Sequence, residues 1–179
     1  MSKIITWPNE ILSKVSKEVD ALTIFQASPI EIKDIVEAMF IVMREQKGIG
    51  LSAIQIGVPL RIFVMDCSNI SQFDKNQMNI QPVPMVCINP TIIDYIGDPI
   101  EMTEGCLSFP GIFEKVMRHN EVILKCEDLT GLVSEYQLTG IEAQCAQHEM
   151  DHLDGITFAT NWGRVKKDIV KRKIAKALK

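Results

Sequence analysis

A nine-residue segment near the C-terminus, residues 147–155, constrains this chain more than any other. It contains the pattern H-E-x-x-H, and His148 and His152 are two of only three histidines in the sequence. On an α-helix, residues four positions apart lie on one face, so both imidazoles can reach one metal ion. Glu149 lies about 100° round the helix from His148, a position that suits a group handling a metal-bound water. The segment predicts a metal-binding helix, against the alternative of a surface helix with two histidines by chance.

Length and composition fit one soluble domain. The chain has 179 residues, of which 46% are hydrophobic and 23% charged, as in ordinary globular proteins. We therefore expect one domain over residues 1–179. No apolar run approaches the ~18 residues of a membrane span, and the first residues show neither a secretory nor a transit peptide. With five cysteines in no framework spacing, these features predict a cytoplasmic protein with free thiols and no membrane partner.

Basic residues gather at the C-terminal end. Residues 164–179 contain eight lysines and arginines and one acidic residue, while the preceding 163 residues contain 11 basic and 22 acidic residues. The apolar residues of this segment recur at a spacing that predicts a helix with one apolar face; they are Val165, Ile169, Val170, Ile174 and Leu178. A basic helix on an acidic body indicates either a partner for that helix or a solvated charged face.

Two further helix starts can be read from the sequence. Residues 28–31 (Ser-Pro-Ile-Glu) have the residue types of a capping box with proline at the first helical position. Apolar residues then repeat at helical spacing until Gly48, and the methionines among them are expected in the core. Thr139 and Glu142 form a second expected capping box, which starts the helix that carries the two histidines.

Short β-forming stretches alternate with turn residues in the middle of the chain. The expected strands cover residues 60–66, 85–89, 91–96, 115–119, 121–127 and 132–138. The turns contain Asn-Pro, Gly-Asp-Pro, His-Asn and Leu-Thr-Gly, and the strands lack the strand–helix alternation of a parallel sheet. The predicted fold class is α+β: antiparallel β-sheets packed around a central metal-binding helix, with an N-terminal helix and a C-terminal helix.

A metal site with two histidines needs a third ligand. After Glu149 the chain has no further glutamate, and no histidine follows His152. These absences exclude the downstream glutamate of thermolysin-like proteases and the third histidine of the metzincins. Asp168 is the only distant carboxylate downstream, and its place in a basic helix makes it a weak candidate. The third ligand is therefore expected upstream.

The upstream candidates are His119 and the cysteines. Four cysteines lie in or beside apolar stretches, where a free cysteine is usually a small core residue; they are Cys67, Cys87, Cys126 and Cys145. Cys106 differs because it follows Gly105, which lets the backbone approach another group closely. The residues alone favour Cys106 and leave His119 open.

Three motifs together resemble those of the peptide deformylase family. Residues 48–55, GIGLSAIQ, resemble G-x-G-L-A-A-x-Q. Residues 104–108, EGCLS, match E-G-C-L-S, and residues 147–153, QHEMDHL, match Q-H-E-x-D-H-L. The likeness extends over nearly the whole chain, and the three motifs in this order are specific where a lone H-E-x-x-H is not. The resemblance implies one deformylase-like catalytic domain over residues 1–179, with residues 164–179 as its basic C-terminal helix.

The resemblance implies a metal-dependent hydrolase. Cys106, His148 and His152 would hold one divalent metal ion and leave a fourth position for water. Metal-bound hydroxide would attack the formyl group of an N-terminal N-formylmethionine on a newly synthesised polypeptide, releasing formate. Glu149 would act as general base and then as general acid.

The family also implies roles for residues around the metal. The Gln55 side-chain amide and the Leu107 backbone N–H would stabilise the oxyanion. The backbone around Ile49, Gly50 and Gly105 would pair with an extended peptide. A pocket for the methionine side chain would be lined by Ile141 and Cys145.

Arg118 and Asp151 are expected to form a structural ion pair that ties the histidine helix to a strand. We expect Arg118→Ala to harm folding more than metal binding. Two positions depart from the family pattern. Ser52 stands where alanine is common, a change interpreted as tolerated, and Phe113 stands where some members have an arginine that contacts the peptide.

The resemblance also implies cofactors and partners. Fe(2+) is the expected native metal, while the ligand types also suit Zn(2+), Ni(2+) or Co(2+). The partners would be N-formylmethionyl nascent peptides, with no DNA and no membrane. The basic C-terminal helix would dock on the ribosome near the exit site, unless it is only a solvated face.

Two other function classes compete with deformylation. A zinc endopeptidase of the HExxH type would cleave internal peptide bonds. A non-enzymatic module would hold a structural metal, usually in a closed site with four protein ligands.

Overall fold

The computed structural model describes residues 3–20, 29–68 and 84–178. In the second of these segments, the side chains are described from residue 32 onwards. In chain order the elements are the 3-10 helix η1 (Glu10–Ser13), α1 (Pro29–Glu45), β1 (Gly50–Ser52), the 3-10 helix η3 (Ala53–Ile56), β2 (Ile62–Met65), β3 (Met85–Gly105), β4 (Phe113–Glu127), β5 (Val133–Thr139), α2 (Gly140–Leu153) and α3 (Arg164–Ala177). The expected N-terminal, histidine-bearing and C-terminal helices are thus all present. The expected cap at Ser28 lies outside the described residues.

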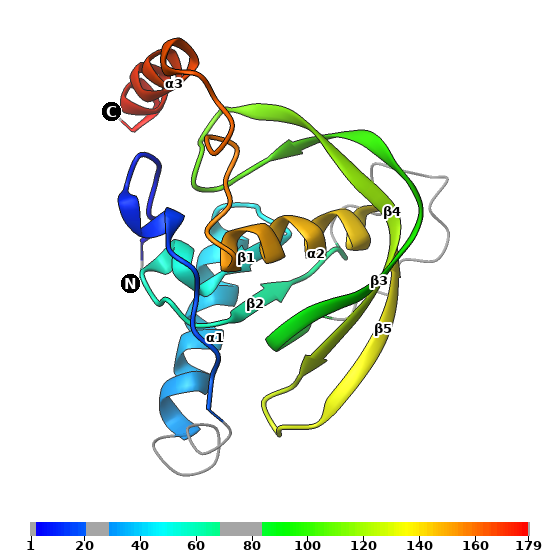
Figure 1. Ribbon diagram of the computed structural model, residues 1–179. Helices are drawn as coiled ribbons and strands as arrows, with labels where there is room; N and C mark the ends of the chain where they lie inside the picture. The colour runs from blue at the N-terminus through cyan, green and yellow to red at the C-terminus, as the bar shows by residue number, and fades with distance from the viewer. Residues whose placement is uncertain (1–2, 21–28, 69–83, 179) are drawn as a thin grey trace.

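The strands form one five-stranded antiparallel sheet in the order β1-β2-β3-β4-β5. Figure 1 shows β3 and β4 curving around one end of α2. The α+β class with antiparallel strands is confirmed, and the described strands join in a single sheet rather than in several.

The expected boundaries inside β3 and β4 were wrong. Residues 85–89 and 91–96 belong to one strand of 21 residues, β3, and residues 115–119 and 121–127 belong to one strand of 15 residues, β4. The pairing of β3 with β4 shifts register between Ile88 and Thr91, Ile92 and Asp94, and Ile96 and Pro99. Such irregularities absorb the proline and glycine residues without ending the strand, and they increase its bend.

Strand β2 is buried on both faces because a helix covers each side of the sheet. Ile62 and Val64 belong to a core cluster with the Met39 and Met43 side chains of α1. Phe63 and Met65 belong to a second cluster, which includes buried residues of α2. This alternation is the period of two expected along a strand. The methionines of α1 are core residues, as predicted.

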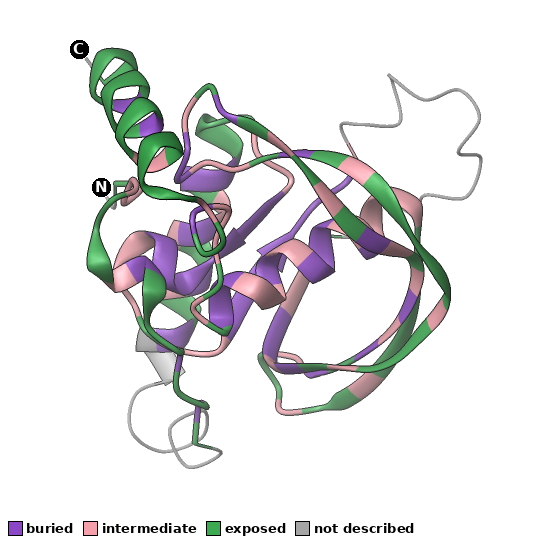
Figure 2. Ribbon diagram, turned by 45° about the horizontal axis from the view of Figure 1, so that its top comes forward, coloured by how far each residue is buried: buried purple, intermediate pink, exposed green. Residues whose placement is uncertain are grey.

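Helix α2 lies inside the curve of the sheet. Its apolar side chains Ala143, Cys145, Ala146 and Leu153 are buried against residues of β2, β3, β4 and β5. Figure 2 shows α2 largely buried near the centre of the molecule, whereas α3 is mostly exposed at its edge. The metal-binding motif is therefore held on a helix that the sheet fixes from several sides.

The expected capping box at the start of α2 was wrong. Thr139 is the N-cap residue, but its side chain makes no capping hydrogen bond. Thr139 still belongs to β5, where it pairs with Glu121, and Gly140 makes the turn into the helix with φ 56°. A backbone that is already committed to the sheet and a glycine that adopts positive φ replace the side-chain cap.

Helix α3 buries only part of its predicted apolar face. Val170 and Ile174 are buried in a cluster with Phe109, Ile112 and Ala159. In contrast, Val165, Ile169 and Leu178 are exposed. Among the described residues, no helix combines the length and apolar character that a membrane span requires.

Candidate metal centre and catalytic site

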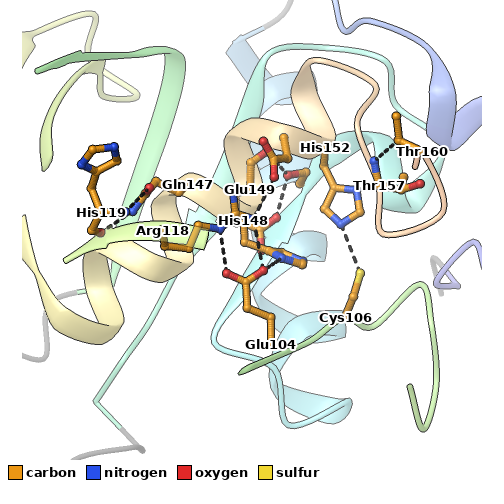
Figure 3. Close-up of polar contacts among 12 residues, drawn as sticks. Glu104, Cys106, Arg118, His119, Gln147, His148, Glu149, His152, Thr157 and Thr160 are labelled. Atoms are coloured by element: carbon orange, nitrogen blue, oxygen red, sulfur yellow. Dashed lines mark hydrogen bonds and ion pairs between the residues drawn. The ribbon is translucent and has the colours of Figure 1, made fainter. Parts of the chain in front are cut away.

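Helix α2 and the residue after β3 bring three candidate ligand residues together. The ligand atoms of Cys106, His148 and His152 all lie within 4.8 Å of one another. Figure 3 shows the Cys106 thiol facing the His152 ring, with Sγ 3.1 Å from Nε2. His119 lies elsewhere, because its Nδ1 contacts the carbonyl oxygen of Gly97 at 2.8 Å. A thiol with two imidazoles is a donor set that fits a divalent transition metal.

A carboxylate orients one of the two histidine rings. The Oε2 atom of Glu104 lies 2.8 Å from Nδ1 of His148. When a metal-binding histidine donates one ring N–H to a carboxylate, its other nitrogen is left for the metal. Burial lowers the pKa of His152 well below its ordinary value, and the neighbouring His148 and Arg118 lower it further. Burial lowers the pKa of His148 too, but its contacts with Cys106 and Glu104 outweigh this effect and raise the pKa well above its ordinary value. Of the two rings, only His152 is therefore held in the neutral form that binds a metal.

Arg118 joins the carboxylate behind His148 to the histidine helix. Its guanidinium forms two hydrogen bonds with Glu104, from Nε to Oε1 at 2.8 Å and from Nη2 to Oε2 at 3.1 Å. It also forms an ion pair with Asp151 at 2.8 Å. The structure thus places Arg118 against Asp151, and it adds Glu104, which sequence reasoning missed. Burial raises the pKa of Glu104, but hydrogen bonds from His148 and Arg118 outweigh it and lower the pKa to about 2.

Glu149 is buried beside the ligand group and held by strand β1. The Ser52 hydroxyl donates to Oε2 of Glu149 at 2.6 Å. Burial raises the pKa of Glu149, and the nearby His148 and the Ser52 hydrogen bond oppose this rise. A carboxyl group whose pKa lies above its ordinary value can exchange a proton more readily near neutral pH.

Gln55 presents its amide nitrogen to the same place. Its Oε1 accepts a hydrogen bond from the backbone N–H of Ser52 at 2.9 Å. Its Nε2 donates to the Ser108 hydroxyl at 3.1 Å and lies 3.7 Å from Sγ of Cys106. The side chain is almost fully buried, so the orientation of its N–H donors is fixed.

One cavity of about 550 Å³ reaches these groups. The predicted catalytic and ligand residues on its wall are Gln55, Cys106, Leu107, His148 and Glu149. The predicted substrate-binding residues on its wall are Ile49, Gly50, Gly105, Ile141 and Cys145. His152 does not line this cavity and borders a second one of about 370 Å³. The three sequence motifs therefore converge on a single cavity.

Comparison with known proteins identifies the family. A model of the polypeptide deformylase family matches residues 1–168. The chain belongs to the polypeptide deformylase family. Peptide deformylase from Bradyrhizobium diazoefficiens is 38% identical to it over 179 residues, which cover 100% of this chain and 97% of the relative. Peptide deformylase from Hahella chejuensis is 39% identical over 178 residues, with 98% and 96% covered.

Solved deformylase structures have the same fold. A crystal structure of peptide deformylase from Ehrlichia chaffeensis aligns with a TM-score of 0.83 at 32% identity, covering 98% of this chain and 96% of that chain. A structure of the same Ehrlichia deformylase in complex with actinonin also aligns with a TM-score of 0.83. Membership identifies an enzyme of the peptide deformylase class and supports deformylation as its activity.

Within this deformylase site, sequence reasoning missed two contacts of the motif residues. Ser52 was interpreted as a tolerated change from alanine, yet its hydroxyl contacts Glu149. Ser108 accepts from Gln55. The only sequence signal for either contact was that each serine belongs to one of the three motifs, because each partner lies far away in the chain.

Proposed function

We propose that this protein removes the formyl group from the N-terminal N-formylmethionine of newly synthesised polypeptides and releases formate. One divalent metal ion would be held by Cys106, His148 and His152. The observation that carries the proposal is that the ligand atoms of these three residues lie within 4.8 Å of one another, while Cys106 and His148 share one cavity wall with Glu149 and Gln55. We further propose that residues 1–179 act as one catalytic domain in the cytoplasm.

The bound ion would lower the pKa of a water molecule to about 7 in a favourable site, so that this water can act as the nucleophile. Glu149 takes the proton of the water as its oxygen bonds to the formyl carbon. The N–H donors of Gln55 and the backbone N–H of Leu107 stabilise the oxyanion of the tetrahedral intermediate. When the carbon–nitrogen bond breaks, Glu149 delivers the proton to the leaving amine, and formate departs.

The peptide would bind along the wall of the cavity that includes Ile49, Gly50 and Gly105. Strand β1 is the terminal strand in the order of the described sheet, and an edge strand can accept an extended peptide through backbone hydrogen bonds. The methionine side chain would occupy the part of the cavity lined by Ile141 and Cys145. Backbone pairing is indifferent to side chains, which suits an enzyme that must accept many nascent chains.

The native metal is proposed to be Fe(2+), with Zn(2+), Ni(2+) and Co(2+) as other ions that the thiol and imidazole ligands accept. An iron–thiolate site is sensitive to oxidation. Purification without oxygen, followed by measurement of metal content, is therefore part of any assay.

The decisive experiment measures formate release from formyl-Met-Ala-Ser. The anaerobically purified protein should release formate, and Glu149→Ala should abolish most of this activity. A zinc endopeptidase would instead cleave an internal bond of a blocked peptide. A structural metal module would show no dependence on Glu149. If the wild-type protein releases no formate at full metal content, the proposal is rejected.

We also propose that α3 docks on the ribosome near the exit site. Six cationic side chains are exposed on this helix, and they are Arg164, Lys166, Lys171, Arg172, Lys173 and Lys176. Attraction to phosphates should weaken steeply as salt is raised. Charge reversal at Lys171 and Lys173 should weaken ribosome binding while leaving formate release unchanged. Salt-independent binding would favour the alternative of a solvated face.

A further inference from the structure

We propose that Ser52 is a positioning residue for the reaction, whose hydroxyl holds Oε2 of Glu149 so that Oε1 is the oxygen that carries the proton. This inference rests on the proposed role of Glu149 as proton carrier. It differs from that role because it assigns separate tasks to the two oxygens of one carboxylate, and it assigns a task to a residue outside the set that touches substrate or metal.

The hydroxyl of Ser52 is placed to hold one carboxylate oxygen. Ser52 is fully buried, and its Oγ lies 2.6 Å from Oε2 of Glu149. The backbone carbonyl of Glu149 lies farther from the same hydroxyl, at 3.0 Å. A hydroxyl has one proton to donate, and an ionised carboxylate is the stronger acceptor. The geometry therefore favours the bond to Oε2.

The other carboxylate oxygen, Oε1, lies beside Gly50, which has no side chain. A Cβ atom added to Gly50 would lie 2.5 Å from Oε1 of Glu149 and 2.6 Å from Sγ of Cys145. Gly50 also lines the substrate cavity. Oε1 thus occupies space that any larger residue at position 50 would fill, next to a glycine of the cavity wall.

Strand β1 supplies a rigid support for both contacts. Gly50 pairs with Met65 and Ser52 pairs with Phe63 in the antiparallel sheet. All three residues of β1 are buried. The backbone N–H of Ser52 also holds Oε1 of Gln55. One short strand consequently orients the proton carrier through a side chain and the oxyanion donor through its backbone.

Substitution at Ser52 separates these two tasks. Ser52→Ala removes the hydroxyl but retains the backbone N–H that holds Gln55. Ser52→Cys keeps a similar shape with a much weaker donor. The matched control is Ser16→Ala, because Ser16 is also buried and its Oγ has no hydrogen-bond partner among the described residues. All variants are compared as metal-loaded enzyme with measured metal content and melting temperature.

The expected result is a loss of kcat of about tenfold in Ser52→Ala and Ser52→Cys, the effect of losing one hydrogen bond to a charged group. KM should stay within about twofold, since substrate binding is not altered. Ser16→Ala should leave both constants unchanged. A double-mutant cycle completes the test: in a Glu149→Asp background the shorter carboxylate cannot reach Ser52, so Ser52→Ala should have little further effect.

An unchanged kcat in both Ser52 variants would overturn the inference. It would also be overturned if Ser52→Ala lowered kcat by the same factor in the wild-type and Glu149→Asp enzymes. A rise in KM with constant kcat would also overturn it. Failure of the proposed function looks different, because the wild-type enzyme itself would then release no formate. If the wild-type enzyme releases formate and Glu149→Asp is impaired, the proposed role of Glu149 is supported. The Ser52 variants then test the role of Ser52 alone.

Discussion

The carboxylate of Glu104 connects Arg118 to His148, with its Oε2 2.8 Å from Nδ1 of His148 and 3.1 Å from Nη2 of Arg118. Groups that hydrogen-bond to metal-binding histidines typically change metal affinity by about 10–100-fold when they are mutated. We expect Glu104→Gln to weaken metal binding by about tenfold, because the amide keeps the acceptor but loses the charge. Competition with a chelator measures the change. Glu101→Gln is the control, since Glu101 lies on the same strand and pairs with the exposed Lys115; equal effects of the two variants would contradict the prediction.

Glu104 also predicts a pH dependence of stability. Its pKa falls from 4.5 to about 2 on folding, because hydrogen bonds from His148 and Arg118 outweigh the effect of burial. A carboxyl with a lowered pKa stabilises the fold fully above its unfolded pKa and loses that contribution as pH falls towards the folded pKa. The difference in free energy of unfolding between wild type and Glu104→Gln should therefore shrink as pH falls from about 4.5 to about 2. Urea unfolding of the metal-free proteins measures it, and a difference that grows on acidification would contradict the assignment.

Arg118→Ala should lower stability more than it lowers metal affinity. The substitution leaves Glu104 and Asp151 without their shared cation, and removing one partner of a buried ion pair costs about 3–5 kcal/mol. Arg44→Ala is the comparison, because Arg44 is 53% exposed in its ion pair with Asp66 and pairs of this kind are worth about 1 kcal/mol or less. Urea unfolding and chelator competition are measured on both variants. A stable Arg118→Ala protein that had lost its metal would show that the expectation is wrong.

Much of the fold could be predicted from local patterns in the sequence. The spacing of His148 and His152 predicted the face of a helix, and the lack of downstream ligands directed attention to Cys106. Both features depend on residues close together or on simple absences, so no knowledge of distant contacts was required. The same holds for the buried methionines of α1, which follow from helical spacing.

Contacts between distant residues could not be predicted in the same way. Ser52 and Glu149 are 97 positions apart, so a serine in place of alanine carries no sign of its partner. The continuity of β3 through Pro90 and Gly97 depends on irregular pairing with β4, which a turn-forming composition conceals. In both cases the tertiary arrangement determines what the residue does.

Gly50→Ala should impair catalysis because a side chain would displace Glu149. The added Cβ would lie 2.5 Å from Oε1 of Glu149, so the carboxylate must move away from its position against β1. Displacement of a reacting group by about 1 Å can cost ~100-fold in rate. Gly163→Ala is the control, because Gly163 has no atom within 4 Å of the added Cβ. Steady-state formate release compares the two, and a fully active Gly50→Ala enzyme would mean that Glu149 tolerates the shift.

Phe113 should set a preference among residues that follow the methionine. Its side chain is 71% exposed, it lines the same cavity as Cys106 and Gly105, and its ring lies 3.0 Å from where a Gly105 Cβ would be. An exposed aromatic ring at the wall of a peptide site gains from contact with an apolar side chain, and partial burial of such a chain is worth roughly 1 kcal/mol, about fivefold in affinity.

The test compares kcat/KM for formyl-Met-Ala-Leu and formyl-Met-Ala-Asp. The wild-type enzyme should favour leucine, and Phe113→Arg should shift the ratio towards aspartate by about fivefold or more, since it replaces apolar contact with a positive charge. Met117→Arg is the matched control: Met117 lies on the same strand and is 56% exposed, but it is not part of the cavity wall. An equal shift in both variants would assign the effect to net charge alone, and no shift in Phe113→Arg would place these peptide residues beyond the reach of the ring.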